Sequence, residues 1–260
     1  MFARVLVGVD GDASGRDAIA VARLLVGAGR RLSLVHVHEL TPWRGASGAY
    51  GPDEDQESLA LLERERDATG VDADLLTVTA SSVGRGLHYL AEREHADLLC
   101  VGSSERSFAG RVLIGDVTRA ALIGAPCAVV VAPFGCAQAG TSIRRVGVGY
   151  DGSPESEDAL TVARDLASHH GATLTALMVF TRTEAIEEGE RELASLDGVE
   201  GKVATGSPGE ELAAFSAEVD ILIVGSRGYG PIRSLMFGST AVHLASNAAC
   251  PLLVLPRRAE

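Results

Sequence analysis

The stretch Val5-Leu-Val-Gly-Val-Asp-Gly11 returns later in the chain as Val146-Gly-Val-Gly-Tyr-Asp-Gly152. Each version joins a short apolar run to an aspartate and a glycine, which is the pattern of a buried strand that ends in a turn. The match continues at the same spacing beyond the quoted residues, where Asp17 corresponds to Asp158. Repeats this long indicate duplicated domains rather than the units of a solenoid.

A second pair of matching stretches gives the limits of the two copies. Asp97-Leu-Leu-Cys-Val-Gly-Ser103 matches Asp220-Ile-Leu-Ile-Val-Gly-Ser226, at a smaller spacing than the first pair. The first copy therefore contains extra residues, and the Gly, Pro, Ser and Asp content of Glu39–Ser58 predicts a long loop there. A chain of 260 residues suits two domains of average size. We expect one domain over 1–134 and one over 143–260, with Gly135–Ser142 as the linker.

Apolar runs and helical patterns alternate within each copy. Pro154–Ser168 places its apolar residues on one helical face, and Ser239–Asn247 follows a glycine with a residue suited to a helix start. Strands that are buried on both faces and joined by helices predict an α/β fold with a parallel sheet, which binds ligands beyond the carboxyl ends of its strands. The strands expected in the second copy are Arg145–Tyr150, Thr173–Phe180, Gly201–Thr205, Asp220–Gly225 and Leu252–Leu255.

Composition excludes several classes of protein. The chain has 35 acidic and 23 basic residues, and its net charge of -12 opposes general binding of nucleic acid. The four cysteines show no metal-site spacing, so we expect free thiols, and the charged N-terminus lacks a signal-peptide core. These features predict a cytoplasmic protein. The uncharged stretch Ala120–Ala137 contains two prolines, so it predicts a helix end followed by a strand rather than a membrane span.

The strongest local motif has the form G-x2-G-x9-G-S. It consists of Gly225-Ser-Arg-Gly228 after an apolar run, and then Gly238-Ser239-Thr240. Glycines after a strand let backbone amides approach a ligand, and a helix that begins at Gly238-Ser239 offers free amides to phosphate oxygens. The alternative is that Gly228 serves a turn and Ser239 only caps a helix.

Asp151 follows the first strand of the second copy. If that strand lies beside the one that ends at Gly225, the carboxylate reaches the same crevice and can accept hydrogen bonds from a ribose or hold a metal. The alternative is a turn aspartate, because Tyr150-Asp-Gly-Ser-Pro154 has the residues of a turn and a helix cap.

Three motifs of the second copy together resemble the universal stress protein family in its tandem form. They are Val148-Gly-Tyr-Asp151-Gly-Ser-Pro154, Gly206-Ser-Pro208-Gly-Glu-Glu-Leu212 and the G-x2-G-x9-G-S motif. The resemblance implies a five-stranded, Rossmann-like parallel sheet with helices on both faces in each domain, ATP at the strand ends, and pairing of the two domains through their last strands. By position, Asp151 would hold the ribose and Val179 would meet the adenine through its backbone. The residues that would line the ribose and phosphates are Val224, Gly225, Gly228, Gly238, Ser239 and Thr240.

The first copy departs from the motif at the phosphate positions. Glu105 stands where the second glycine is expected, and Asp116 replaces the serine. Each carboxylate would repel a triphosphate by about 1 to 4 kcal/mol at 4 Å. We therefore expect one ATP per chain, with Asp116 serving as the N-cap of a helix over 117–124.

The leading functional hypothesis is an ATP-binding stress-response or regulatory protein. The alternatives are a slow ATP-hydrolysing or adenylate-transferring enzyme that uses the same site, and an interaction scaffold with both sites empty. The only lysine, Lys202, has no Walker A context, and the histidines have no catalytic partner at a recognisable spacing. We therefore expect no catalytic set and no protein metal site, while Mg²⁺ with the nucleotide and dimerisation of whole chains stay open. The apolar edges Ala128–Ala132 and Leu252–Leu255 are expected to pair within the chain.

Overall fold

The computed structural model describes residues 1–40, 52–103, 115–140, 142–181, 186–226 and 239–256. The first half of the chain contains five strands and five helices among these residues. The strands are β1 (Phe2–Gly8), β2 (Val26–Glu39), β3 (Asp74–Ala80), β4 (Leu98–Gly102) and β5 (Ala128–Ala132). The helices are α1 (Ala13–Leu25), α2 (Pro52–Thr69), α3 (Val83–Arg93), α4 (Asp116–Leu122) and α5 (Cys136–Ala139).

The second half repeats this order of elements. Its strands are β6 (Arg145–Gly149), β7 (Thr173–Phe180), β8 (Glu200–Thr205), β9 (Ile221–Gly225) and β10 (Leu252–Leu255). Its helices are α6 (Pro154–His170), α7 (Ile186–Ala194), α8 (Pro208–Phe215) and α9 (Ser239–Asn247). The predicted strands therefore form where the apolar runs lie, and the α/β fold class is confirmed.

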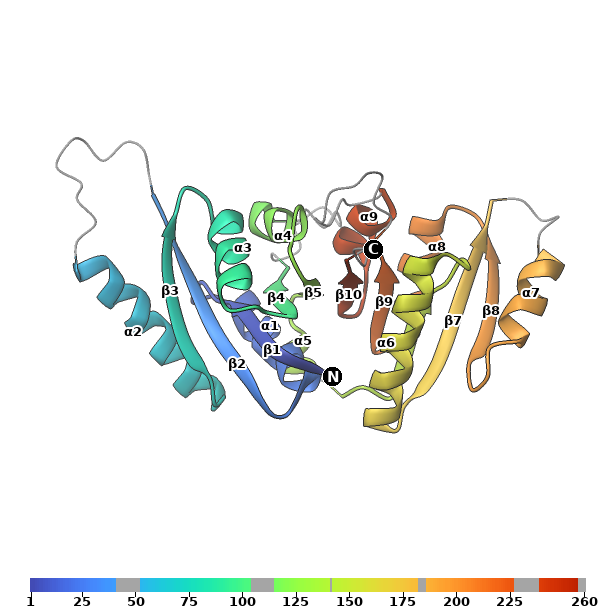
Figure 1. Cartoon of the computed structure of the whole chain (residues 1–260), viewed down its shortest axis with the longest axis horizontal. Helices are drawn as coiled ribbons and strands as arrows, with labels where there is room; N and C mark the ends of the chain where they lie inside the picture. The colour runs from blue at the N-terminus through green and yellow to red at the C-terminus, as the bar shows by residue number, and fades with distance from the viewer. Residues whose placement is uncertain (41–51, 104–114, 141, 182–185, 227–238, 257–260) are drawn as a thin grey trace.

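All ten strands form one continuous sheet, in the order β3-β2-β1-β4-β5-β10-β9-β6-β7-β8 (Figure 1). Neighbouring strands within each half are parallel. The two halves meet at the antiparallel pair of β5 and β10, where Val130 lies opposite Leu253. In each half the strand order reverses beside the first strand, between β1 and β4 and between β6 and β9. Parallel sheets bind ligands at this kind of reversal point.

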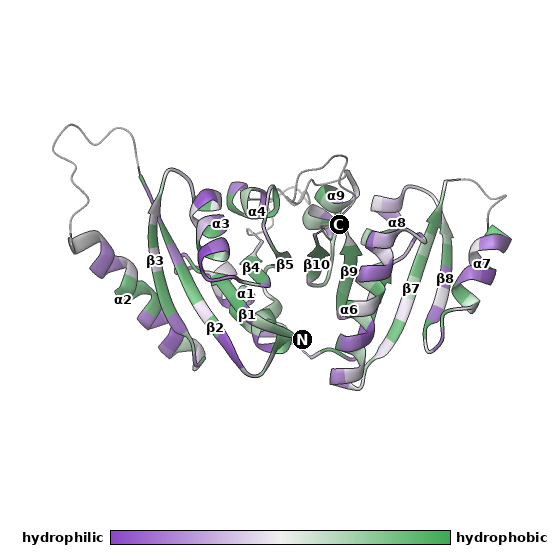
Figure 2. Cartoon of the chain, in the orientation of Figure 1, coloured by the Kyte–Doolittle hydropathy of each residue, from purple (hydrophilic) through white to green (hydrophobic). Residues whose placement is uncertain are grey.

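The hydrophobic core has two layers, one on each face of the sheet. Val130 and Leu253 belong to the layer that includes α1 and α6, whereas Val129 and Val254 belong to the layer on the opposite face. Both layers contain residues from both halves, so the core continues across the β5–β10 pair. Figure 2 shows mainly hydrophobic residues along the central strands β9 and β10, and both hydrophilic and hydrophobic residues on helices such as α2 and α6.

The extra residues of the first half differ from the predicted long loop. Residues 41–51 lie outside the described part of the chain, but Pro52–Ser58 belongs to α2, an 18-residue helix, whereas α7 in the second half has nine residues. The prediction was wrong for this segment because a proline at the first helical position, with its fixed φ, favours a helix start.

The predicted linker is partly helical and is attached to the first half. Asp17, which is 1% exposed, accepts hydrogen bonds from the backbone N–H groups of Gly135 and Ala137, each at 2.7 Å. These amides lie at the N-terminal end of α5, where a carboxylate is electrostatically favourable. The carboxylate of α1 therefore holds the beginning of the linker.

The four cysteines are free thiols, as predicted. Burial raises the pKa of Cys127 and of Cys250 to about 12, so both behave as small apolar residues of the core. None of the helices in the described ranges combines the length and the hydrophobicity that a membrane-spanning helix requires. The uncharged stretch after Ala120 instead forms the end of α4 and then β5, as its prolines predicted.

Candidate functional site

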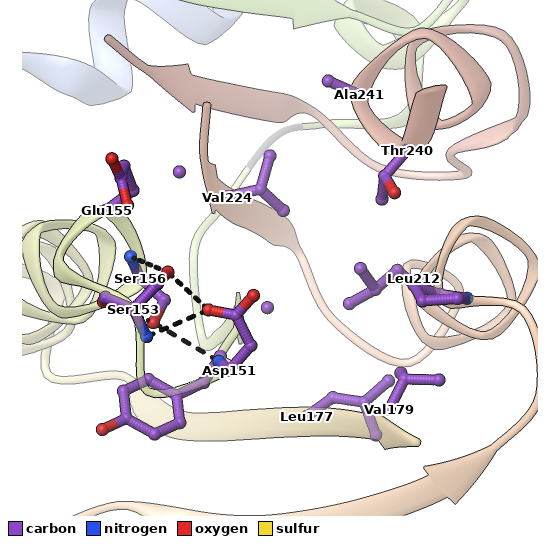
Figure 3. A pocket seen from close by; sticks show the side chains of 14 residues that line it. Asp151, Ser153, Glu155, Ser156, Leu177, Val179, Leu212, Val224, Thr240 and Ala241 are labelled. Atoms are coloured by element: carbon purple, nitrogen blue, oxygen red, sulfur yellow. Dashed lines mark hydrogen bonds between the residues drawn. The ribbon is translucent and has the colours of Figure 1, made fainter. Parts of the chain in front are cut away.

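A cavity of about 300 Å³ lies at the carboxyl ends of β6, β7 and β9 (Figure 3). It occupies the reversal point of the second half, because β6 pairs with β9 on one side and with β7 on the other. The residues that line it are Gly149, Tyr150, Asp151, Ser153, Glu155, Ser156, Leu177, Val179, Pro208, Leu212, Val224, Gly225, Thr240 and Ala241.

Asp151 lies in the turn between β6 and α6 and lines the cavity. Its carboxylate accepts hydrogen bonds from the backbone N–H of Ser153, at 3.1 Å, and from the Ser153 hydroxyl. Ser153 is the N-cap of α6, and its hydroxyl oxygen accepts a hydrogen bond from the Ser156 N–H. Asp151 is therefore both a turn residue and a cavity residue, because the turn that begins α6 also presents the carboxylate to the cavity.

The cavity has an apolar side. Leu177 and Val179 project from β7, two positions apart and therefore from the same face of the strand, and Leu212 reaches in from α8. Figure 3 shows Leu212 and Thr240 across the cavity from Ser153. Aliphatic side chains contributed by a strand and a helix suit a flat, largely apolar ring. Sequence reasoning did not select Leu177 or Leu212, although the alternation with Val179 could have indicated Leu177.

Gly225 ends β9 at the edge of the cavity, and the structure gives a packing reason for this glycine. A Cβ atom at Gly225 would clash with the backbone carbonyl of Glu155 in the first turn of α6. The corresponding Gly102 at the end of β4 meets Ser14 in the first turn of α1 in the same way. Close packing of the first helix therefore gives one reason for a glycine at this position in both halves.

Carboxylates gather on the α6 side of the cavity. Asp151 and Glu155 both line it, as does Tyr150, whose hydroxyl donates a hydrogen bond to Glu157. Burial, and then the contact with Glu157, raise the pKa of Tyr150 above its ordinary value, so the phenol stays protonated. In the described ranges, no group of three or more His, Cys, Asp or Glu side chains is arranged to hold a metal ion.

The other predicted site residues lie on the far side of the cavity or beyond the described ranges. Gly228 and Gly238 fall in residues 227–238, outside the described part of the chain. Ser239 begins α9, as predicted, and Thr240 follows it and lines the cavity. The predicted residues that the structure brings together around one cavity are Asp151, Val179, Val224, Gly225 and Thr240.

The first half has an equivalent cavity of about 290 Å³ at the ends of β1, β2 and β4. Asp116 lines it and is exposed, while Glu105 lies outside the described residues. The prediction that Asp116 caps α4 was wrong: Gly115, with φ −56° and ψ 145°, is the N-cap, and Asp116 is the first helical residue. An extended Gly115 lets the helix begin one residue earlier, where Asp116 still meets the positive end of the helix dipole.

Asp10 and Asp12 form a pair of carboxylates in this first cavity. Burial, and then the nearby Asp12, raise the pKa of Asp10. Burial acts in the same direction on Asp12, but hydrogen bonds from Ser14, from Asp10 and from the Gly15 amide hold the pKa of Asp12 below its ordinary value. Asp12 is the N-cap of α1, so the first helix of this half begins on a carboxylate and not on a serine.

Comparison with known proteins gives the family. The model of the Universal stress protein family matches residues 1–133, 142–197 and 181–256. The chain belongs to the universal stress protein family. Repetition of the match along the sequence shows the tandem form of a universal stress protein, as the resemblance implied.

Curated relatives match along nearly the whole chain. A universal stress protein of Mycolicibacterium smegmatis is 30% identical over 98% of this chain and 97% of its own length. One of Mycobacterium tuberculosis is 27% identical over 96% of each. Among solved structures, a universal stress protein from Archaeoglobus fulgidus covers 98% of both chains with a TM-score of 0.76 and 19% identity. A putative universal stress protein from Pseudomonas aeruginosa has a TM-score of 0.69 and 16% identity, over 98% of this chain and 94% of its own. These structures establish that the fold is shared over the full chain.

Proposed function

We propose that this universal stress protein binds ATP in the cavity of its second half and acts as a stress-response or regulatory module. The observation that carries the proposal is the arrangement of that cavity at the reversal point. An apolar slot between β7 and α8 lies beside the Asp151 carboxylate, with the start of α9 on the far side. A ring, a sugar and a phosphate chain each meet groups of the matching chemistry in this order.

Each group would have a distinct role. The adenine would lie between Leu177 and Leu212 and meet the backbone of Val179, and the Asp151 carboxylate would accept hydrogen bonds from ribose hydroxyls. The phosphates would follow β9 past Val224 and Gly225 toward the G-x2-G-x9-G-S segment and the Thr240 hydroxyl. Mg²⁺ would enter with the triphosphate as the nucleotide's own counterion.

The proposal is one of binding and not of turnover. The bound nucleotide would stabilise one conformation or complex of the protein, and slow hydrolysis or adenylate transfer in the same cavity is the rival hypothesis. We further propose that 1–134 and 143–260 are the two domains, that the β5–β10 pair joins them in solution, and that the protein works in the cytoplasm, where free thiols stay reduced.

Isothermal titration calorimetry of the full chain with ATP and Mg²⁺ tests the proposal. The variant Gly238→Glu adds bulk and negative charge to the predicted phosphate position and should abolish binding. Gly115→Glu, the same change at the matching position of the first half, is the control and should leave ATP affinity unchanged. Unchanged affinity in Gly238→Glu would refute the assignment, and release of ADP or AMP during long incubation with the unmodified protein would favour the enzymatic alternative.

A further inference from the structure

The cavity of the first half keeps the apolar part of the second one. At about 290 Å³ it is nearly equal in size to the second cavity, at about 300 Å³. Val35 lies opposite Gly8 in the sheet, as Leu177 lies opposite Gly149, so β2 and β7 present the same faces. Val35, Val37 and Leu87 line the first cavity where Leu177, Val179 and Leu212 line the second. The slot proposed for a ring is therefore present in both halves.

The polar end of the first cavity is different. Asp10 lies at the position of Asp151, after the first strand, but carboxylates also occupy two other corresponding positions. Asp12 stands where the second half has Ser153, and Asp116 begins α4 at the position of Ser239. At the position of Glu155 the first half has Ser14, so it has one carboxylate fewer than the second half there. The resulting set places negative charge on both sides of the end where phosphates would lie.

The amides at the start of α1 are also occupied. The Asp12 carboxylate accepts hydrogen bonds from the backbone N–H groups of Ser14, at 2.7 Å, and of Gly15, at 3.2 Å. These are the groups through which a helix N-terminus attracts an anion. In the second half the corresponding acceptor is the neutral hydroxyl of Ser153. A phosphate that entered the first cavity would therefore meet a carboxylate at the helix start.

We propose that the first cavity binds an unphosphorylated purine nucleoside and favours one whose 5′ arm carries an amine. The inference rests on the proposed function, because it uses the same ring slot and the same ribose carboxylate. The ring would lie between Val35 and Leu87, the ribose would meet Asp10, and the ammonium group would lie toward Asp12 and Asp116. The chain would then carry two sites of similar shape that select ligands of opposite charge.

The expected selectivity follows from the charges. One ammonium at about 4 Å from one carboxylate gains about sixfold in affinity even at the dielectric constant of water. The amine should therefore bind at least about sixfold more tightly than adenosine, which has the same ring and sugar. ATP should bind the first cavity more weakly than adenosine by at least the same factor.

Calorimetry of the full chain with 5′-amino-5′-deoxyadenosine, adenosine and ATP tests the inference. Leu87→Trp fills the first cavity, and Leu212→Trp is the same change at the matching position of the second. We expect Leu87→Trp to abolish the site that binds the amine more tightly than adenosine, and to leave ATP binding unchanged. Leu212→Trp should do the reverse. Loss of ATP binding in Leu212→Trp tests the proposed function separately, so either proposal can fail while the other stands.

Asp116→Ser supplies a second variant, because an exposed first-turn residue can be replaced without disturbing the core. It should reduce the preference for the amine over adenosine by about sixfold and preserve the thermal unfolding transition. The inference is overturned if the unmodified chain does not bind the amine at millimolar concentration. It is also overturned if a folded Leu87→Trp variant binds the amine normally, or if Asp116→Ser keeps the full preference.

Discussion

β4 and β9 each end in a glycine, Gly102 and Gly225, and an experiment can decide whether helix packing or a ligand requires a glycine there. A Cβ atom at Gly102 or Gly225 would clash with a backbone carbonyl in the first turn of α1 or α6, so the helix must shift to admit a methyl group. Overpacking of this kind costs about 1–3 kcal/mol. Alanine also stiffens the unfolded chain and returns about 0.4–1 kcal/mol. We therefore expect Gly102→Ala and Gly225→Ala each to lower the free energy of unfolding by about 1–2 kcal/mol in the absence of any nucleotide.

Urea unfolding of the ligand-free chain, followed by circular dichroism, measures this effect. Gly8→Ala is the matched control, because the atoms nearest to a Cβ there belong to the side chains of Leu87 and Val101, at an ordinary 3.5 Å. That variant should unfold within about 0.5 kcal/mol of the unmodified protein. If Gly102→Ala proves as stable as Gly8→Ala, the glycine is not there for helix packing, and a ligand-based reason would have to replace it.

Three further predictions concern the linker, acid stability and stoichiometry. Asp17→Ala removes two charge-assisted hydrogen bonds of a buried carboxylate and should lower the free energy of unfolding by about 2–4 kcal/mol. Amide hydrogen exchange in α5 should become faster, and unchanged exchange would contradict the attachment of the linker to α1. Burial alone would raise the pKa of Asp220, but hydrogen bonds from the Arg145 side chain and from backbone amides hold it below its ordinary value. The stabilisation that the ionised Asp220 contributes is therefore present above about pH 4 and is lost as the pH falls through the lower pKa of the folded protein. Asp220→Asn and Arg145→Gln should each make the free energy of unfolding in urea fall less steeply between pH 6 and pH 2. If both variants lose urea resistance as steeply as the unmodified protein, the Asp220–Arg145 pair is not responsible for the acid sensitivity. Equilibrium dialysis of the unmodified protein should give one ATP per chain, and the double variant Glu105→Gly with Asp116→Ser should gain a weak second site. Two equivalent sites in the unmodified protein would refute the argument that Glu105 and Asp116 repel ATP from the first half.

The parts of the site that follow a strand could be predicted from the sequence. The apolar run before Asp151 identifies a buried strand, and the aspartate must then lie at its carboxyl end. The sequence leaves open whether this strand lies beside the one that ends at Gly225, and the pairing of β6 with β9 in the structure answers that question. Local patterns therefore sufficed where the chemistry lies within a few residues of a strand end.

The residues that could not be predicted depend on contacts between distant elements. Leu212 belongs to a helix whose apolar residues serve both the core and the cavity, and no local pattern tells which of them reaches the ligand side. Asp116 looked like a helix cap because Asp is a favourable N-cap residue, yet the backbone of Gly115 decided where α4 begins. Gly225 was interpreted as an opening for a ligand, whereas its nearest neighbour across the missing side chain is the helix start at Glu155.

The antiparallel pair at the centre of the sheet also imposes an order on synthesis. β5 ends at Ala132, and more than a hundred further residues are synthesised before its partner Leu252–Leu255 leaves the ribosome. At about 5–20 residues per second, β5 waits on the order of ten seconds with one bare, fully apolar edge. Such an edge can pair with another nascent chain, and a first half that has paired in this way no longer has room for β10. The timing of translation therefore contributes to correct assembly: slow translation of the second half lengthens the aggregation-prone interval, and fast translation shortens it.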